Sequence, residues 1–269
     1  MSGWIERPSP NFDVRREGCP IDILVLHYTG MRNAEEALNR LCDPDAKVSA
    51  HYTIDRDGRV YRHVDESLRA RHAGISWWAA ERDVNSRSIG IELVNPGHEF
   101  GYEPFPDAQI DALIDLAHGI FARHPVPPHR VVGHSDVAPA RKMDPGELFP
   151  WPELATSGIG IFPPPPPHDT HHGRPESRPP GSERPRAERV SRHSGARWPG
   201  GRVEPGHDEI EGSVASRLAA FGYGVPPDVD VPLAAVVTAF QRHFRPGKID
   251  GVVDVETDSR LSALLEMME

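Results

Sequence analysis

One segment near the middle of the chain holds the residue types that metal-assisted hydrolysis needs. The apolar run at residues 130–133 ends at His134, and Asp144 follows ten residues later in a loop bounded by proline and glycine. A second apolar run, at residues 21–28, contains His27 at its end. Two histidines and one carboxylate with an open fourth position form a catalytic zinc arrangement. If the two strands are neighbours, these three side chains can surround one ion.

Spacing alone leaves a plainer interpretation open. The chain has 15 histidines, which offer many combinations of three ligands. A histidine at the end of a strand can also simply hydrogen bond to backbone groups. Lysine is rare in this chain, which has 27 arginines and only three lysines, at positions 47, 142 and 248. Each lysine position is therefore informative.

The elements that must position these residues alternate between strands and helices. Branched apolar runs are typical of buried strands, and apolar residues at intervals of three and four are typical of helices. The expected strands are residues 21–28, 88–94 and 130–134, with a hairpin over 49–63 and helices at 34–41 and 107–124. This alternation predicts an α/β layer arrangement.

Proline divides the chain into three parts. Eleven of its 29 prolines lie between residues 163 and 207, five of them consecutive, in a stretch without apolar periodicity. Such a stretch cannot bury enough surface to offset its ordering entropy, which predicts a disordered linker at 163–208. We therefore expect a catalytic domain at 1–162 and a small domain of three helices at 209–269.

Charge and composition exclude several classes of protein. The formal charge is −10 overall and +3 in the proline-rich stretch, so the rest of the chain carries about −13, which disfavours nucleic acid as a partner. Two cysteines are too few for a disulfide framework. The sequence has no apolar run long enough to span a membrane and no signal peptide at its start. A cytoplasmic location is expected, with the periplasm or cell envelope as the alternative.

Five sequence blocks, taken in order, carry a specific resemblance. They are Leu26–Thr29, Val48–Tyr52, Ala70–Gly74, Ser88–Leu93 and His134–Gly146. Together they resemble the landmarks of zinc-dependent N-acetylmuramoyl-L-alanine amidases of the AmiD and AmpD type. The resemblance implies a mixed central β-sheet flanked by helices.

Position by position, the resemblance implies that His27, His134 and Asp144 bind Zn²⁺. It also implies that Glu92 is the catalytic carboxylate and Lys142 the catalytic lysine. A positioned carboxylate can take a proton from water and return it to the leaving amine, and an ammonium can stabilise an oxyanion. The plainer alternatives are a solvated carboxylate on the polar face of a strand and a surface lysine.

Other residues of these blocks are candidates for shaping the cleft. His72, Trp77 and Asn85 are expected to contact substrate, although His72 and His51 could instead hydrogen bond internally. Trp77 could equally be a core or surface aromatic residue. Members of the family commonly have tryptophan where this chain has Arg71, which changes one wall of the expected groove.

A second, shorter resemblance lies near the end of the chain. Residues 239–246, together with Asp250-Gly251 and Glu256-Thr257, resemble the peptidoglycan-binding helical module that follows the catalytic domain of AmiD-type amidases. Such a module would hold the enzyme on its polymer across a flexible linker. The implied partners are peptidoglycan or muropeptides, and we expect a monomer.

The expected function is that of a hydrolase in cell-wall turnover or murein recycling. It would cleave the amide between N-acetylmuramic acid, or its 1,6-anhydro form, and the L-alanine of the peptidoglycan stem peptide. One alternative is a non-catalytic peptidoglycan-recognition protein of the same fold. Another is a lytic amidase of the phage type.

Overall fold

The computed structural model describes residues 3–164 and 207–269. The strands are β1 (Ile5–Glu6), β2 (Phe12–Val14), β3 (Ile23–Tyr28), β4 (Tyr52–Ile54), β5 (Val60–Arg62), β6 (Leu68–Ala70), β7 (Ser88–Leu93) and β8 (Val131–Gly133). The helices are α1 (Ala34–Cys42), α2 (Val84–Arg87), α3 (Gly97–Phe100), α4 (Asp107–Phe121), α5 (His134–Val137), α6 (Trp151–Thr156), α7 (His207–Phe221), α8 (Leu233–Phe244) and α9 (Val255–Glu266), with a 3-10 turn at Pro128–Arg130.

The centre of the fold is a six-stranded sheet in the order β1-β5-β4-β7-β3-β8. Strands β4 and β5 pair antiparallel, as expected for a hairpin over 49–63, and the other pairs in this sheet are parallel. The expected mixed α/β architecture is confirmed. Parallel strands β7, β3 and β8 lie side by side, so their carboxyl ends meet at one edge of the sheet.

The two faces of the sheet bury different partners. On β3, Leu24 and Leu26 belong to a core with α4 and α6, whereas Ile23 and Val25 belong to a core with the C-terminal helices. Because side chains alternate along a strand, His27 lies on the same face as Ile23 and Val25. Both faces of β3 are therefore buried, which accounts for its nearly continuous apolar sequence.

Most expected elements are present close to their predicted bounds. Helix α1 begins after Asn33, whose side chain accepts a hydrogen bond from the Glu36 backbone nitrogen, as an N-cap does. Gly58 in the hairpin turn has φ +85°, a conformation that glycine adopts without strain. The short strands β1, β2 and β6 have too few residues to show a periodic pattern and were not predicted. Among the described helices, none combines the length and apolar character that a membrane span requires.

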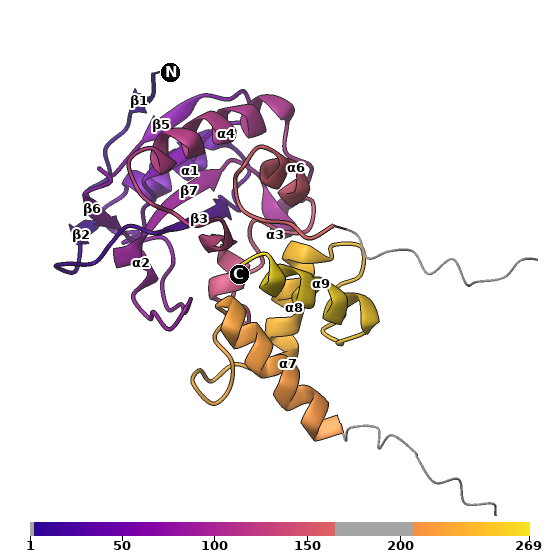
Figure 1. The fold of residues 1–269 in the computed structure, drawn as a ribbon. Helices are drawn as coiled ribbons and strands as arrows, with labels where there is room; N and C mark the ends of the chain where they lie inside the picture. The colour runs from indigo at the N-terminus through magenta and orange to yellow at the C-terminus, as the bar shows by residue number, and fades with distance from the viewer. Residues whose placement is uncertain (1–2, 165–206) are drawn as a thin grey trace, which may run out of the picture.

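The C-terminal helices share a core with the sheet. Figure 1 shows α7, α8 and α9 gathered against the part of the molecule that contains α5 and β3. The ring of Trp78 is fully buried and contacts Phe221 and Tyr223 at centroid distances of 6.0 and 4.9 Å. The backbone nitrogen of Ala79 donates to the carbonyl of Gly222 (2.7 Å). The expected linker lies almost wholly outside the described residues, but the helices that follow it are docked on the sheet.

Buried histidines make the stability of the fold depend on pH. Burial lowers the pKa of His51 to about 3 and that of His63 to about 4, so both rings are neutral in the folded protein at pH 7. Their pKa in the unfolded chain is about 6.5. The unfolded state therefore binds more protons below that pH, and stability is lost as the pH falls from about 6.5 towards 4.

We expect the free energy of unfolding to fall by about 1.4 kcal/mol per pH unit for each of these histidines. Urea denaturation between pH 7 and pH 4.5, with a chelator present throughout, measures this slope. His63→Asn is expected to make the slope shallower by about one proton's contribution, whatever it does to stability at pH 7. An unchanged slope in this variant would contradict the prediction.

Candidate active site

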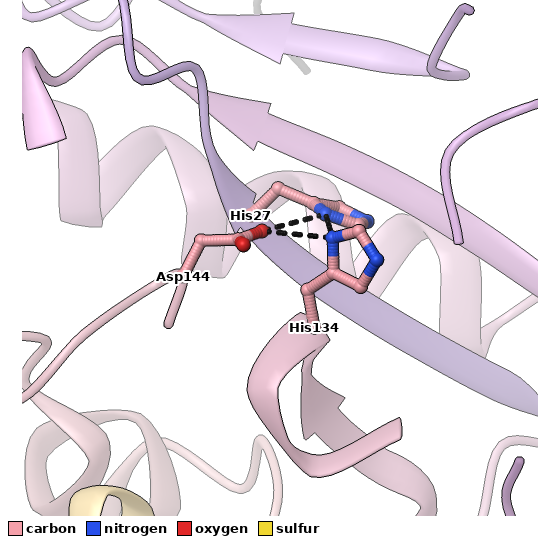
Figure 2. Close-up of side chains that lie close together, drawn as sticks. All are labelled: His27, His134 and Asp144. Carbon is pink, nitrogen blue, oxygen red and sulfur yellow. Dashed lines mark hydrogen bonds and ion pairs between the residues drawn. The ribbon is translucent and has the colours of Figure 1, made fainter. Parts of the chain in front are cut away.

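Three buried side chains meet at the carboxyl ends of β3 and β8. Nδ1 of His27 lies 2.9 Å from Nδ1 of His134 and 2.9 Å from Oδ2 of Asp144. The same Asp144 oxygen lies 3.0 Å from Nδ1 of His134. Figure 2 shows the three side chains pointing at one another, and they are only 1%, 3% and 6% exposed. The structure thus brings together all three predicted ligands.

Strand register explains this convergence. On β3, Leu26 pairs with Gly133 of β8, and His27 pairs with Glu92 of β7. His134 directly follows β8 and opens α5, so it extends beyond the same sheet edge as His27. The loop returns because the Ser135 backbone nitrogen donates to the carbonyl of Asp144 (2.9 Å). Ligands of open α/β sheets commonly bind outside the carboxyl ends of the strands.

The protonation of His134 follows from its second nitrogen. Nε2 of His134 lies 3.0 Å from the backbone carbonyl of Ala73. A carbonyl oxygen can only accept, so Nε2 carries the proton. In the neutral imidazole Nδ1 then has a free lone pair, which points at the carboxylate of Asp144.

A chain of hydrogen bonds decides the protonation of His27 in the same way. The hydroxyl of Ser88 donates to the carbonyl of Val84 (2.7 Å), so its oxygen accepts from Nε2 of His72 (3.1 Å). Nδ1 of His72 is then the acceptor for Nε2 of His27 (3.0 Å). Nδ1 of His27 is therefore also left with a lone pair. Burial and the neighbouring His134 lower the pKa of His27 to about 4, which agrees with a neutral ring.

With these tautomers three lone pairs face one another, an arrangement that a cation bound between them would stabilise. His27, His134 and Asp144 form a His-His-Asp group able to hold a metal ion. Zinc bonds of about 2.0 Å in a tetrahedron would place ligand atoms about 3.3 Å apart. The observed separations of 2.9 to 3.0 Å are close to that value.

The position of the His72 ring depends on the absence of a side chain at Gly90. A Cβ added to Gly90, in the middle of β7, would lie 2.4 Å from the His72 ring. The backbone nitrogens of His72 and Ala73 both donate to Oδ1 of Asn85, at 3.2 and 2.9 Å. Gly90 and Asn85 therefore fix the position of the His72 ring, which in turn hydrogen bonds to His27.

The His-His-Asp group lies beside a cavity of about 500 Å³. Glu92 and Lys142 line this cavity together with His134 and Asp144. Oε2 of Glu92 is buried and has no hydrogen-bond partner among the described residues. Burial, followed by the charge of Asp144, raises the pKa of Glu92 well above its usual value, and the charge of Lys142 only partly offsets this rise. Glu92 is thus a carboxyl group that can hold a proton close to the His-His-Asp group.

The remaining predicted residues lie in different places. His72 lines the cavity and also bonds to His27, whereas Asn85 is 5% exposed and bonds to the backbone. Trp77 lines a separate cavity of about 360 Å³ that includes Val137 and Gly224. Sequence reasoning missed Ser88, which completes the hydrogen-bond chain. Two signals could have indicated it: its place at the start of a buried strand, two positions before Gly90, and its place in the block Ser88–Leu93.

Comparison with known proteins places this site in a family. A family profile described as N-acetylmuramoyl-L-alanine amidase (Amidase_2) matches residues 17–147. The chain is 36% identical to N-acetylmuramoyl-L-alanine amidase AmiD of Escherichia coli (strain K12) over 282 residues, which cover 98% of this chain and 91% of the relative. It is 34% identical to 1,6-anhydro-N-acetylmuramyl-L-alanine amidase AmpD of Haemophilus influenzae over 167 residues, covering 55% of this chain and 89% of that relative.

Solved structures extend the similarity to the C-terminal helices. The complex of E. coli AmiD with the substrate anhydro-N-acetylmuramic acid-L-Ala-D-gamma-Glu-L-Lys matches with a TM-score of 0.69 and 35% identity, covering 94% of this chain and 92% of that one. AmpDh3 of Pseudomonas aeruginosa in complex with anhydromuramic pentapeptide matches with a TM-score of 0.71 and 32% identity, covering 92% of each chain. The chain belongs to the N-acetylmuramoyl-L-alanine amidase family.

Proposed function

We propose that this protein is a zinc amidase of peptidoglycan. It hydrolyses the amide between N-acetylmuramic acid, or its 1,6-anhydro form, and the L-alanine that begins the stem peptide, in cell-wall turnover or recycling. The observation that carries this proposal is the convergence of His27, His134 and Asp144 beside a cavity that His134 and Asp144 help to line. The names of the relatives AmiD and AmpD support the choice of bond.

Zinc fits the donor set better than a harder cation does. Two imidazole nitrogens and one carboxylate oxygen are its usual ligands in hydrolytic sites, whereas calcium and magnesium prefer oxygen alone. When bound, zinc polarises a carbonyl group and lowers the pKa of a water molecule. Nδ1 of His27, Nδ1 of His134 and Oδ2 of Asp144 would hold it.

Glu92 acts as the proton carrier. Its partner across the sheet is His27, so both side chains leave the same face at the same edge. The carboxylate takes a proton from the attacking water and returns it to the leaving amine nitrogen of L-alanine. The raised pKa of Glu92 suits this role, because a carboxyl group must be able to keep the proton between the two steps.

Lys142 stabilises the negative charge that develops on the carbonyl oxygen of the scissile amide. Its side chain lines the same cavity and is two residues from Asp144. A positive charge that is already in place when the oxyanion forms needs no reorganisation at that moment. The cavity therefore has a proton carrier, an oxyanion partner and a group that can hold a metal.

Product analysis tests the proposal directly. Incubation with a disaccharide-free anhydromuropeptide is expected to release anhydro-N-acetylmuramic acid and a peptide with a free L-alanine amino group, both identified by mass spectrometry. Dialysis against a chelator is expected to abolish this release, and added zinc should restore it. In Asp144→Ala, zinc should restore nothing. Cleavage of any other bond, or full activity in chelator, would refute the proposal.

The same assay on intact sacculi addresses the wider biology. Peptidoglycan or muropeptides are the proposed partners, because two similar structures are complexes with anhydromuramic peptides. A non-catalytic recognition protein is the weaker candidate, since all three metal donors and Glu92 are present in one cavity. A monomeric state, a cytoplasmic location and peptidoglycan binding by the C-terminal helices stay predictions.

A further inference from the structure

Two consecutive residues of α8 contact the two ends of the loop that carries the metal donors. This loop, residues 134–147, holds His134, Lys142 and Asp144, and we call it the donor loop. Helix α8 belongs to the C-terminal part of the chain, about 100 residues away in sequence. The contacts differ at the two ends and are described in turn.

At the first end, a buried carboxylate receives three hydrogen bonds. Asp136 is 0% exposed and lies two residues after His134, within α5. Its Oδ2 accepts from the backbone nitrogen of Gly133 (2.7 Å) and from Nδ1 of His243 (2.7 Å). Its Oδ1 accepts from the hydroxyl of Tyr223 (2.6 Å). Two of the three donors therefore come from the C-terminal part of the chain.

Both C-terminal donors are fixed in place. His243 is 3% exposed and its ring stacks on Trp151 at a centroid distance of 3.6 Å. Tyr223 is 1% exposed and its ring contacts Trp78. Burial and the charge of Asp136 raise the pKa of Tyr223 well above its usual value, so its hydroxyl keeps the proton that it donates. Neither donor can move without disturbing an aromatic contact.

At the second end, Arg242 approaches Glu147. Nε of Arg242 lies 3.8 Å from Oε2 of Glu147, and Glu147 in turn contacts Nε2 of His98 (3.1 Å). Nδ1 of His98 contacts the hydroxyl of Tyr28, which directly follows His27 on β3 (3.0 Å). The second end is therefore connected to the strand that carries the other histidine donor.

We propose that His243 and Tyr223 are positioning residues for the metal site. By holding Asp136, they fix the first turn of α5 and hence the direction in which His134 presents Nδ1. Helix α8 is then part of the scaffold of the active site, in addition to any role in binding polymer. This inference rests on the proposed zinc site, because it concerns the orientation of one of its donors.

Zinc affinity, measured by competition with a fluorescent chelator on the full chain, tests this role. Tyr223→Phe removes one donor to Asp136 and keeps the ring, and His243→Phe removes the other donor and keeps an aromatic ring against Trp151. Each is expected to raise the apparent Kd for zinc by about tenfold, the lower range for residues that support a metal ligand. His243→Asn keeps an N–H donor but loses the aromatic stack, so zinc affinity should stay near wild type even if the melting temperature falls.

Gln241 provides the matched control. It precedes Arg242 and His243 on the same helix and is 0% exposed, but the hydrogen bonds of its side chain all go to residues 250–257. Gln241→Leu is expected to lower the melting temperature without changing zinc affinity. A change in zinc affinity in this variant equal to that in His243→Phe would mean that general loosening of α8 is responsible, and the proposal would be wrong.

The outcomes separate this inference from the proposed function. If the wild type binds no zinc, the proposed function fails. If the wild type binds zinc and both phenylalanine variants bind it equally well, only the positioning role fails. If affinity falls in both phenylalanine variants and is kept in His243→Asn and Gln241→Leu, the donor to Asp136 is what matters and the proposal stands.

Discussion

Glu92→Gln is expected to lower kcat by about 10³-fold while the zinc content of the purified protein stays at the wild-type value. Glutamine has nearly the same shape as glutamate and cannot accept and return a proton. Glu92 is absent from the group of three donors, so its replacement leaves the metal-binding atoms unchanged. Steady-state hydrolysis of an anhydromuropeptide, with metal content measured on the same sample, gives both quantities.

The matched control changes another carboxylate at the same cavity. Glu99 lines the cavity but belongs to α3 and is exposed to solvent. Glu99→Gln removes the same charge and is expected to change kcat by less than about threefold, as exposed substitutions away from the chemistry usually do. Wild-type hydrolysis by Glu92→Gln would remove this residue from the mechanism, and an equal loss in both variants would point to the charge of the cavity instead.

A chain that ends at residue 164 is expected to lose most of its stability or to aggregate. The core on one face of the sheet contains Ile23 and Val25 together with residues of α7, α8 and α9, and Trp78 contacts Phe221 and Tyr223. Burying one large apolar side chain contributes about 1.5–3 kcal/mol. Uncovering several at once approaches the whole stability of a typical domain, about 5–15 kcal/mol. Soluble yield and urea denaturation measure the effect.

Supplying the missing helices separately is the control for this truncation. Co-expression of residues 1–164 with residues 207–269 is expected to restore soluble protein, because the docked surfaces do not require a continuous chain. AmpD of H. influenzae aligns with only 55% of this chain, so the requirement concerns the apolar surface of this protein and not the family as a whole. An unfolding midpoint for residues 1–164 equal to that of the full chain would show that the helices add no stability.

The three residues of the His-His-Asp group could be singled out from the sequence because each lies next to an element with a clear pattern. His27 and His134 follow apolar strands, and Asp144 lies in a loop with proline and glycine at its ends. Their meeting could not be derived in the same way. It depends on β3 lying between β7 and β8, and strand order leaves no periodic signal in one sequence.

Docking of the C-terminal helices was beyond sequence reasoning for a related physical reason. The sequence predicts a separate domain of three helices behind a flexible proline-rich linker, because helical periodicity shows which side of a helix is apolar but not what that side packs against. The deciding contacts, such as His243 with Asp136, join residues 107 positions apart. Trp77 and Trp78 illustrate the same limit. They are adjacent and identical in type, and only the structure shows that Trp77 lines the smaller cavity whereas Trp78 is fully buried.

Gly90 gives the site a constraint that an inventory of reactive groups would overlook. The residue has no functional atom, yet its bare Cα provides the space for the ring of His72. The residue at position 90 of a homologous chain therefore indicates whether that chain can form the same bond between His72 and His27. In a homologous chain that retains both histidine donors, Glu92 and the aspartate but has acquired a side chain at this position, the bond between His72 and His27 could not form as it does here. Such a chain would need another hydrogen-bond partner to orient the histidine equivalent to His27, or it would no longer bind a metal ion there.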